Sequence, residues 1–296
     1  MENTEKRPMT PAQRKKRQRL IETLTRAGIQ LLFFLTMPGA FAAGFNGVKD
    51  IFRRIGGGEV LELNGFVSAL AGLCLFTVLF GRYFCGFACA FGSFGDFVFY
   101  ISGLIQKKLF HRKKQYVLPE KITVHGRKVK YAVLAAIVLM CVFGVYDNIT
   151  GFSPWSVFSF LTSLRFNLSG YAAGVVILVL IIAGMAVKER FFCQFLCPMG
   201  AVFSLLPIMP FAQLKRDSAS CIAGCNACKM KCPVDIKLEN DGILNGECIS
   251  CERCTGICPR TNITRWDRRL MKYSIVPMLA KAVLFFAMGA ALGMMR

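Results

Sequence analysis

Long apolar stretches alternate with basic segments along the chain, and this alternation predicts helices that cross a membrane. Four stretches are apolar over most of their length: Ala27–Ala43, Leu63–Phe80, Tyr131–Tyr146 and Ser169–Val187. A fifth runs from Tyr273 to Met294 and contains Lys281, which is expected to extend to the membrane interface or to contact a partner or ligand. Because ~17–25 apolar residues cross a ~30 Å hydrocarbon core, the pattern predicts an all-α integral membrane bundle of about five transmembrane helices.

Lysine and arginine are concentrated in alternate connecting segments. Residues 1–26, 81–130 and 188–272 hold 31 of them, whereas the intervening segments 44–62 and 147–168 hold four. Basic residues that flank membrane helices stay on the cytoplasmic side. The charge pattern therefore predicts a multi-pass protein of the bacterial inner membrane. Its N-terminus and residues 188–272 are expected in the cytoplasm, and its C-terminus outside.

Residues 82–92 and 190–200 form an internal repeat. The first copy reads RYFCGFACAFG and aligns without a gap on RFFCQFLCPMG, at an offset of 108 residues. Each copy holds an arginine and a Cys-x3-Cys pair, and these residues are Arg82, Cys85, Cys89, Arg190, Cys193 and Cys197. Each unit contains two predicted spans, so the repeats are parallel and related by an axis along the membrane normal. Both cysteine pairs are expected at the cytoplasmic boundary, facing each other.

The four repeat cysteines allow three interpretations. Cysteines four apart share a helix face, so two pairs can offer four thiolates to a third iron–sulfur cluster or another metal at the membrane boundary. The alternatives are redox-active thiols that cycle with a quinone or a metal ion, and inert packing residues. Arg82 and Arg190 are candidate cofactor contacts that favour thiolate and raise the potential of a cluster. Otherwise they only mark the cytoplasmic ends of two spans.

Residues 214–271 differ from the rest of the chain because they are polar, loop-like and rich in cysteine. The second of two cysteine runs reads C-x2-C-x2-C-x3-C-P, the spacing of bacterial ferredoxins, in which the fourth cysteine ligates the other cluster. The first run has one extra residue between its first two cysteines. One predicted [4Fe–4S] cluster is held by Cys221, Cys225, Cys228 and Cys258, and the other by Cys248, Cys251, Cys254 and Cys232. Structural zinc is the alternative, although it does not require two interlocked runs.

Composition and charge change this picture only a little. Hydrophobic residues make up 54% of the chain, against ~45–50% in soluble domains even when glycine is counted. A net charge of +20 is typical of proteins that bind nucleic acid or anionic lipid. Here most of the charge lies in segments that set the membrane orientation. Membrane lipid is therefore the expected contact, with no role for nucleic acid. Two further cysteines, Cys74 and Cys141, lie singly in predicted spans and are expected to be packing residues.

The order of spans, the two Cys-x3-Cys boundaries, the two-cluster segment and the late span resemble the NapH/NosR group of polyferredoxin-like membrane proteins. The chain looks closest to the NapH type, the membrane quinol-dehydrogenase component of periplasmic nitrate reduction. Residues Cys193–Pro198 match the Cys-x3-Cys-Pro motif of that group, whereas Cys85–Ala90 lack its proline. The resemblance implies electron transfer between a quinone pool or cytosolic donor and partner redox subunits. Nitrate itself is not implied.

These patterns together predict six segments, and the resemblance implies a subunit of a quinol dehydrogenase-like system. The segments are a basic cytoplasmic N-terminus (1–26), a first membrane repeat (27–106), a basic cytoplasmic loop (107–130), a second membrane repeat (131–213), a two-[4Fe–4S] ferredoxin-like domain (214–271) and a C-terminal transmembrane helix (272–296). No acid–base pair marks a catalytic pocket. Two alternative functions are a copper reductase or assembly factor that uses the boundary cysteines, and a redox-sensing membrane scaffold.

Overall fold

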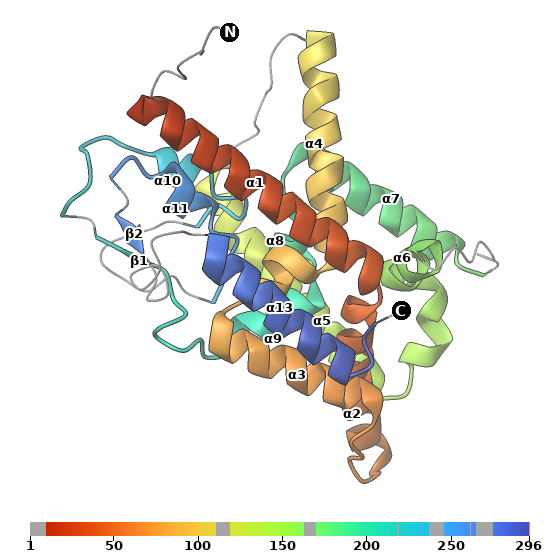
Figure 1. The fold of residues 1–296 in the computed structure, drawn as a ribbon. Helices are drawn as coiled ribbons and strands as arrows, with labels where there is room; N and C mark the ends of the chain where they lie inside the picture. Colours follow the sequence, from red (N-terminus) through yellow and green to blue (C-terminus); the bar gives the residue numbers. More distant parts are fainter. Residues whose placement is uncertain are drawn as a thin grey trace, which may run out of the picture.

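The computed structural model describes residues 10–110, 119–162, 170–217, 219–236, 246–260, 262–264 and 275–295, which are mainly helical (Figure 1). The first part of the chain forms α1 (Pro11–Thr36), α2 (Ala40–Gly57), α3 (Gly65–Phe80), the π-helical turn η1 (Phe84–Ala88) and α4 (Ala90–Phe110). The second forms α5 (Glu120–Val142), the 3-10 helix η2 (Tyr146–Phe152), α6 (Pro154–Thr162), α7 (Ala172–Val187), α8 (Phe191–Phe195) and α9 (Pro198–Leu205). The rest forms β1 (Lys215–Arg216), α10 (Ala227–Met230), α11 (Arg253–Ile257), β2 (Ile263–Thr264) and α13 (Ile275–Ala291). The predicted helical character of the chain is confirmed.

Helix α1 starts and stops at clear local signals. The Thr10 hydroxyl accepts a hydrogen bond from the N–H of Gln13, and the Gln13 side chain accepts one from the N–H of Thr10, which together form a capping box. The helix ends just before Pro38, because a proline ring cannot continue an α-helix. Helix α2 then departs at 61°. The single span predicted over 27–43 is therefore wrong, since two helices meet inside it.

Three other predicted stretches correspond to single helices, namely α3, α7 and α13. The stretch 131–146 includes the C-terminal part of α5, which ends at Val142, and extends to the first residue of η2. Helix α5 begins inside the segment predicted to be a basic loop. Helix α4 was not predicted, and the boundary expected between residues 26 and 27 falls within α1. Among the described helices, none is by itself both long and apolar enough to cross a bilayer. Residues Lys16–Thr36 with Ala40–Gly57 meet that requirement as a bent pair.

Aromatic side chains fill the core of the helical part. Phe285 of α13 is fully buried. Its ring contacts those of Phe33 in α1, Phe76 in α3 and Phe84 in η1, at centroid distances of 5.3, 5.0 and 5.8 Å. Edge-to-face and offset pairs of this kind are favourable beyond the apolar area that they bury. The last helix of the chain is therefore held tightly among elements of the first repeat.

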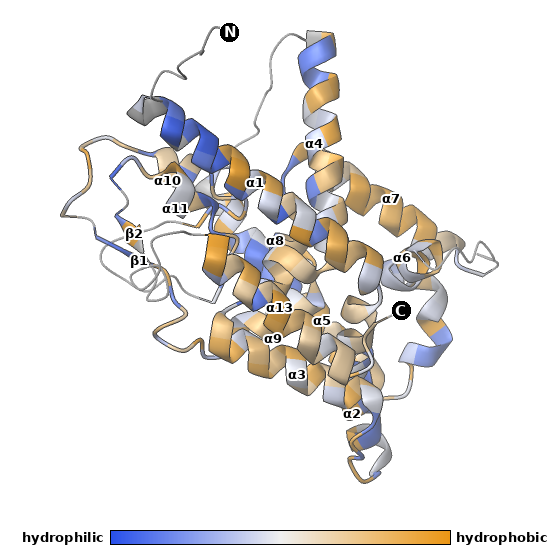
Figure 2. Cartoon of the chain, in the orientation of Figure 1, coloured by the Kyte–Doolittle hydropathy of each residue, from blue (hydrophilic) through white to orange (hydrophobic). Residues whose placement is uncertain are grey.

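Hydropathy changes along α1 (Figure 2). Its N-terminal half is hydrophilic and lies beside α11, whereas its C-terminal half is hydrophobic and packs with α13. Arg19 donates hydrogen bonds to the carbonyls of Gly256 and Ile257 at the end of α11, from Nε at 3.0 Å and Nη2 at 3.3 Å. Strands β1 and β2 pair antiparallel in the same region. The cysteine-rich segment therefore docks against the polar end of α1.

Candidate functional site

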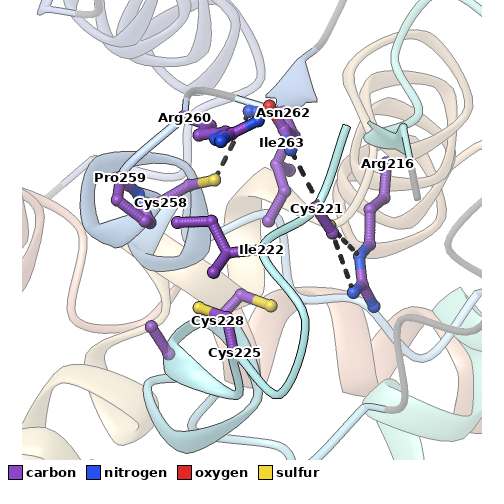
Figure 3. Close-up of a pocket in the computed structure, with 11 residues that line it drawn as sticks. Arg216, Cys221, Ile222, Cys225, Cys228, Cys258, Pro259, Arg260, Asn262 and Ile263 are labelled. Carbon is purple, nitrogen blue, oxygen red and sulfur yellow. Dashed lines mark hydrogen bonds between the residues drawn. The ribbon is translucent and has the colours of Figure 1, made fainter. Parts of the chain in front are cut away.

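Four cysteines from both cysteine runs line one cavity (Figure 3): Cys221, Cys225, Cys228 and Cys258, here called the outer set. Arg216 of β1 donates two hydrogen bonds to Sγ of Cys221, from Nε at 3.4 Å and from Nη2 at 3.3 Å. The N–H of Asn262 donates to Sγ of Cys258 at 3.4 Å. The guanidinium hydrogen bonds hold the pKa of the Cys221 thiol below its usual range. This cavity therefore favours negative charge on sulfur.

Four further cysteines line a second cavity with mostly apolar walls: Cys232, Cys248, Cys251 and Cys254, here called the inner set. The other wall residues include Leu214, Val234, Ile236 and Ile249, all of them buried. Burial raises the pKa of Cys248 to about 12 and that of Cys232 to about 11. The inner set is thus the drier of the two, and the thiols of Cys232 and Cys248 need a bound metal to become thiolates near neutral pH.

Backbone turns around Cys251 bring the inner set together. Ser250 and Glu252, on either side of it, both have positive φ, at 51° and 57°. Residues other than glycine adopt this left-handed conformation only when the surrounding structure enforces it. Glu252 is itself buried, and its Oε1 lies 3.8 Å from Nζ of Lys281 in α13. Lys281 is buried too, and it forms an internal ion pair with the cysteine-rich segment.

Each of the two sets combines three cysteines of one run with the last cysteine of the other run, the arrangement that ferredoxin spacing predicts. Cys258 closes the second run in sequence but lies with the first three cysteines, and Cys232 closes the first run but lies with the other three. A cubane takes one thiolate at each of its four irons, so its ligands stand farther apart than those of a single ion. Within the described residues, no three Cys, His, Asp or Glu side chains form a site for one metal ion. Both cavities fit a four-iron cluster in donor type and number.

The repeat cysteines Cys85, Cys89, Cys193 and Cys197, here called the boundary set, occupy equivalent positions in two equivalent turns. The N–H of Cys89 donates to the carbonyl of Phe84 at 2.8 Å, and the N–H of Cys197 donates to that of Phe192 at 2.9 Å. Cys89 and Cys197 also share one backbone conformation, with φ, ψ of −70°, 114° and −71°, 114°. The missing proline after Cys89 therefore does not alter the turn.

All four boundary thiols are buried and lie near one another. Their residues are between 5% and 7% exposed. Burial raises the pKa of Cys197, and the nearby thiols of Cys193, Cys85 and Cys89 raise it further. Burial also raises the pKa of Cys193, even though the Arg190 guanidinium acts in the opposite direction. Arg190 thus favours the thiolate form of Cys193, as expected from the sequence, but burial outweighs it.

Arg82 and Arg190 are almost completely buried, and each lies between the two repeats. Arg82 Nη2 lies 3.9 Å from Sγ of Cys85, and Arg190 Nη1 lies 3.9 Å from Sγ of Cys193. Arg190 also donates to the carbonyl of Cys85 in the other copy, at 2.6 Å. Glycines provide the space that each arginine needs to reach the other repeat. A Cβ at Gly92 would stand 2.3 Å from Arg190 Nη1, and one at Gly200 would stand 3.2 Å from Arg82 Nη2.

An aspartate that sequence reasoning missed neutralises part of this buried charge. Asp96 of α4 forms a bidentate pair with Arg190, at 2.7 Å from Nε to Oδ1 and 2.6 Å from Nη2 to Oδ2. Arg26 and Arg253 approach the same carboxylate at 3.7 and 3.9 Å. Burial by itself raises the pKa of Asp96, but the three guanidinium groups outweigh it and lower that pKa to about 2. The signal available in the sequence is an acid alone in an apolar stretch.

A second missed acid, Glu247, connects the boundary and inner sets. It precedes Cys248, and it accepts hydrogen bonds from Lys130 and, at 2.9 Å, from the Tyr131 hydroxyl. Arg82 Nη1 lies 3.9 Å from Glu247 and donates to the carbonyl of Gly246 at 3.0 Å. The hydrogen bond and ion pairs with Lys130 and Arg82 lower the pKa of Glu247 against the opposing effect of burial. The carboxylate therefore stays charged beside both sets.

Comparison with known proteins gives one family model and several relatives. Residues 63–114 and 172–207 match the model described as "4Fe-4S binding domain". An uncharacterized protein of Methanocaldococcus jannaschii is 31% identical over 78% of this chain and 90% of its own length. The putative electron transport protein YccM of Escherichia coli is 28% identical over 64% of this chain and 52% of its own. The ferredoxin-type protein NapH of Haemophilus influenzae is 24% identical over 65% of this chain and 64% of its own length. No solved structure matches the chain.

Proposed function

The chain belongs to the NapH-type polyferredoxin family, and on that basis we propose that it is a membrane-bound electron-transfer protein. It carries two [4Fe–4S] clusters and passes electrons between a quinol or cytosolic donor and a partner oxidoreductase. Bound clusters supply one-electron redox chemistry. The protein holds one cluster in the outer set and one in the inner set. Relatives named for ferredoxin and for electron transport support this function.

The single observation that carries the proposal is the pair of four-cysteine cavities. Each holds three cysteines of one run and the last cysteine of the other. The protein supplies main-chain N–H groups to sulfur in both cavities, from Asn262 to Cys258 and from Ile236 to Cys232, each at 3.4 Å. Such hydrogen bonds are a usual feature of iron–sulfur sites, where they adjust the reduction potential.

Exposed apolar side chains support a place in the membrane. Leu75 of α3, Leu180 of α7 and Val283 of α13 are 61%, 65% and 68% exposed. Large exposed apolar surfaces mark contact with a partner or with lipid. We therefore assign α3, the apolar part of α5, α7, α13 and the bent pair of α1 and α2 to the bilayer. The cysteine-rich segment then faces the cytoplasm, in agreement with the excess of lysine and arginine in that part of the chain.

Iron and sulfide analysis combined with electron paramagnetic resonance tests this function. Protein purified anaerobically in detergent is expected to contain at least about eight irons per chain. After reduction by dithionite, it should be reoxidised by a quinone analogue and not by a matched reagent that cannot accept electrons. A preparation that lacks iron contradicts the cluster assignment. Clusters that are present but are not oxidised by any quinone analogue contradict the quinone link.

The Arg216→Leu variant provides a more specific prediction for the outer set. Arg216 places positive charge and two hydrogen bonds on Cys221, which stabilises the more negative, reduced cluster. Removing it is expected to lower the midpoint potential of one cluster by about 60 mV, equivalent to about 1.4 kcal/mol for one electron. Redox titration followed by electron paramagnetic resonance measures the shift. The matched control is Lys215→Leu, the preceding exposed residue of β1, which should leave both potentials unchanged.

A further inference from the structure

We propose that the boundary set binds a third iron–sulfur cluster, to which each copy of the repeat contributes two thiolates. This proposal rests on the proposed electron-transfer function and adds a centre between the inner set and the apolar helices. Insertion of a preformed cluster exchanges its carrier's four thiolates for those of the boundary set, and the four thiol protons pass to the carrier. The argument depends on placement, polar contacts and charge around the four cysteines.

The first argument is the symmetry of the four donors. Two elements 108 residues apart, η1 and α8, end in the same turn and deliver their second cysteine with the same backbone conformation. The N–H of Gly200 donates to Sγ of Cys197 at 3.1 Å, a main-chain contact of the kind that sulfur ligands receive. None of the four cysteines forms a disulfide. Packing alone does not require two equivalent sulfur pairs to meet across the repeat axis.

The second argument is the charge that surrounds these thiols. Arg82 and Arg190 each direct a guanidinium group at a boundary thiol from 3.9 Å, and both are about 1% exposed. Nε of Arg82 has no hydrogen-bond partner in the described part of the chain. A buried donor without a hydrogen-bond partner is costly. An anionic cluster between the arginines is a group that offsets this cost.

The third argument is the direct connection to the inner set. Gly86 follows Cys85, and a Cβ added to it would stand 2.4 Å from the carbonyl oxygen of Ile249 and 3.5 Å from the nitrogen of Cys251. Arg26 Nη1 donates to the carbonyl of Cys251 at 3.1 Å. The main chains that carry the two sets are therefore in contact. As a relay, a boundary cluster gains the one electron that an inner cluster loses, with no bond formed or broken.

The family match provides an independent fourth argument. The matched residues, 63–114 and 172–207, cover both copies of the repeat and contain all four boundary cysteines. They contain none of the eight cysteines of the outer and inner sets. The model described as a 4Fe-4S binding domain is thus similar to the part of the chain that holds the boundary set.

Iron content and spectra of paired variants test the proposal. Wild-type protein is expected to hold about four irons more than the eight of the outer and inner sets for a cubane, or about two more for a two-iron cluster. The variants Cys85→Ser and Cys193→Ser, one in each repeat, should each lose that same increment and one resonance signal. The matched control Cys74→Ser changes a cysteine of α3 inside the matched region but outside the set, and should lose no iron.

The controls also separate this proposal from the function on which it rests. If wild type and all three variants hold about eight irons, the boundary cluster is refuted and the two-cluster function stands. Stoichiometric zinc or copper that disappears in Cys85→Ser, with iron unchanged at eight, also refutes it. Less than eight irons in wild type instead refutes the proposed function. Because a serine variant can misfold, Arg82→Gln gives a second measure. It should retain all the iron and shift the potential of the additional signal more than the potentials of the other two clusters.

Discussion

The Asp96→Asn variant is expected to lose about 3–5 kcal/mol of stability, because it removes one partner of a buried charge cluster. Asp96 lies within 4 Å of Arg190, Arg26 and Arg253. Asparagine keeps the size of the side chain but leaves three guanidinium groups without their shared anion. Thermal unfolding of the anaerobic protein in detergent, followed by far-ultraviolet circular dichroism, measures the difference. A variant as stable as wild type contradicts the role assigned to this carboxylate.

The matched control for Asp96 is Asp147→Asn. Asp147 also pairs with an arginine, Arg53, but both side chains are well exposed. Exposed pairs contribute between nothing and about 1 kcal/mol, so this change should be close to neutral. The ion pairs of Asp96 also predict how the stability of the wild-type protein depends on pH. Because the folded pKa of Asp96 lies below its usual value, at about 2, its contribution is complete above about pH 4 and is lost as the pH falls toward 2. Asp96→Asn should lack this decline.

Cys232→Ser is expected to remove the inner cluster and spare the outer one, whereas Cys258→Ser should do the reverse. Each change costs about four irons of the eight. The expectation follows from the crossed sets, in which each run of the sequence supplies its last cysteine to the cavity of the other run. Iron analysis with electron paramagnetic resonance of the two variants tests it. Serine has nearly the shape of cysteine, so packing changes little.

The Arg216 substitution identifies which signal belongs to which set. The signal whose potential shifts in Arg216→Leu is the outer one, and it should persist in Cys232→Ser and vanish in Cys258→Ser. Loss of the other signal in Cys258→Ser is the outcome that contradicts the crossed sets. Cys141→Ser is a further control, since this buried cysteine of α5 lies outside all three sets.

The apolar stretches predicted three helices well because their signal is local. Residues 63–80, 169–187 and 273–294 each contain one apolar helix, and the helix ends fall close to the predicted ones. The stretch 27–43 failed because apolar composition is insensitive to the break at Pro38. Helix α4 was missed because glycines and Asp96 interrupt its apolar residues. The helix continues over 21 residues through Asp96. The arginines that pair with this carboxylate come from other parts of the chain, so the sequence of α4 alone does not reveal them.

The cysteine sets were predictable for a related reason. Cysteine spacing is a short-range pattern that is tied to one kind of chemistry, and the structure groups the eight cysteines as the spacing predicts. Asp96, Glu247 and Lys130 were not predicted, because their charged partners lie 70 to 165 residues away in the chain. Only the folded molecule brings them together. Spacing therefore indicates the ligands, whereas the charges that adjust a cluster depend on tertiary structure.

The crossing of Arg82 and Arg190 between the repeats has the form of an interface between two identical subunits. In such an interface, the same patch is used twice, and each partner supplies what the other lacks. Here each repeat supplies a glycine that makes room for the arginine of the other. A half-length chain with one repeat would therefore complete this arrangement only by pairing with a second copy of itself. The present chain carries both copies in one molecule, so each copy is free to change its sequence separately. Ala90 and Pro198, which occupy equivalent positions of the two repeats, are one such difference.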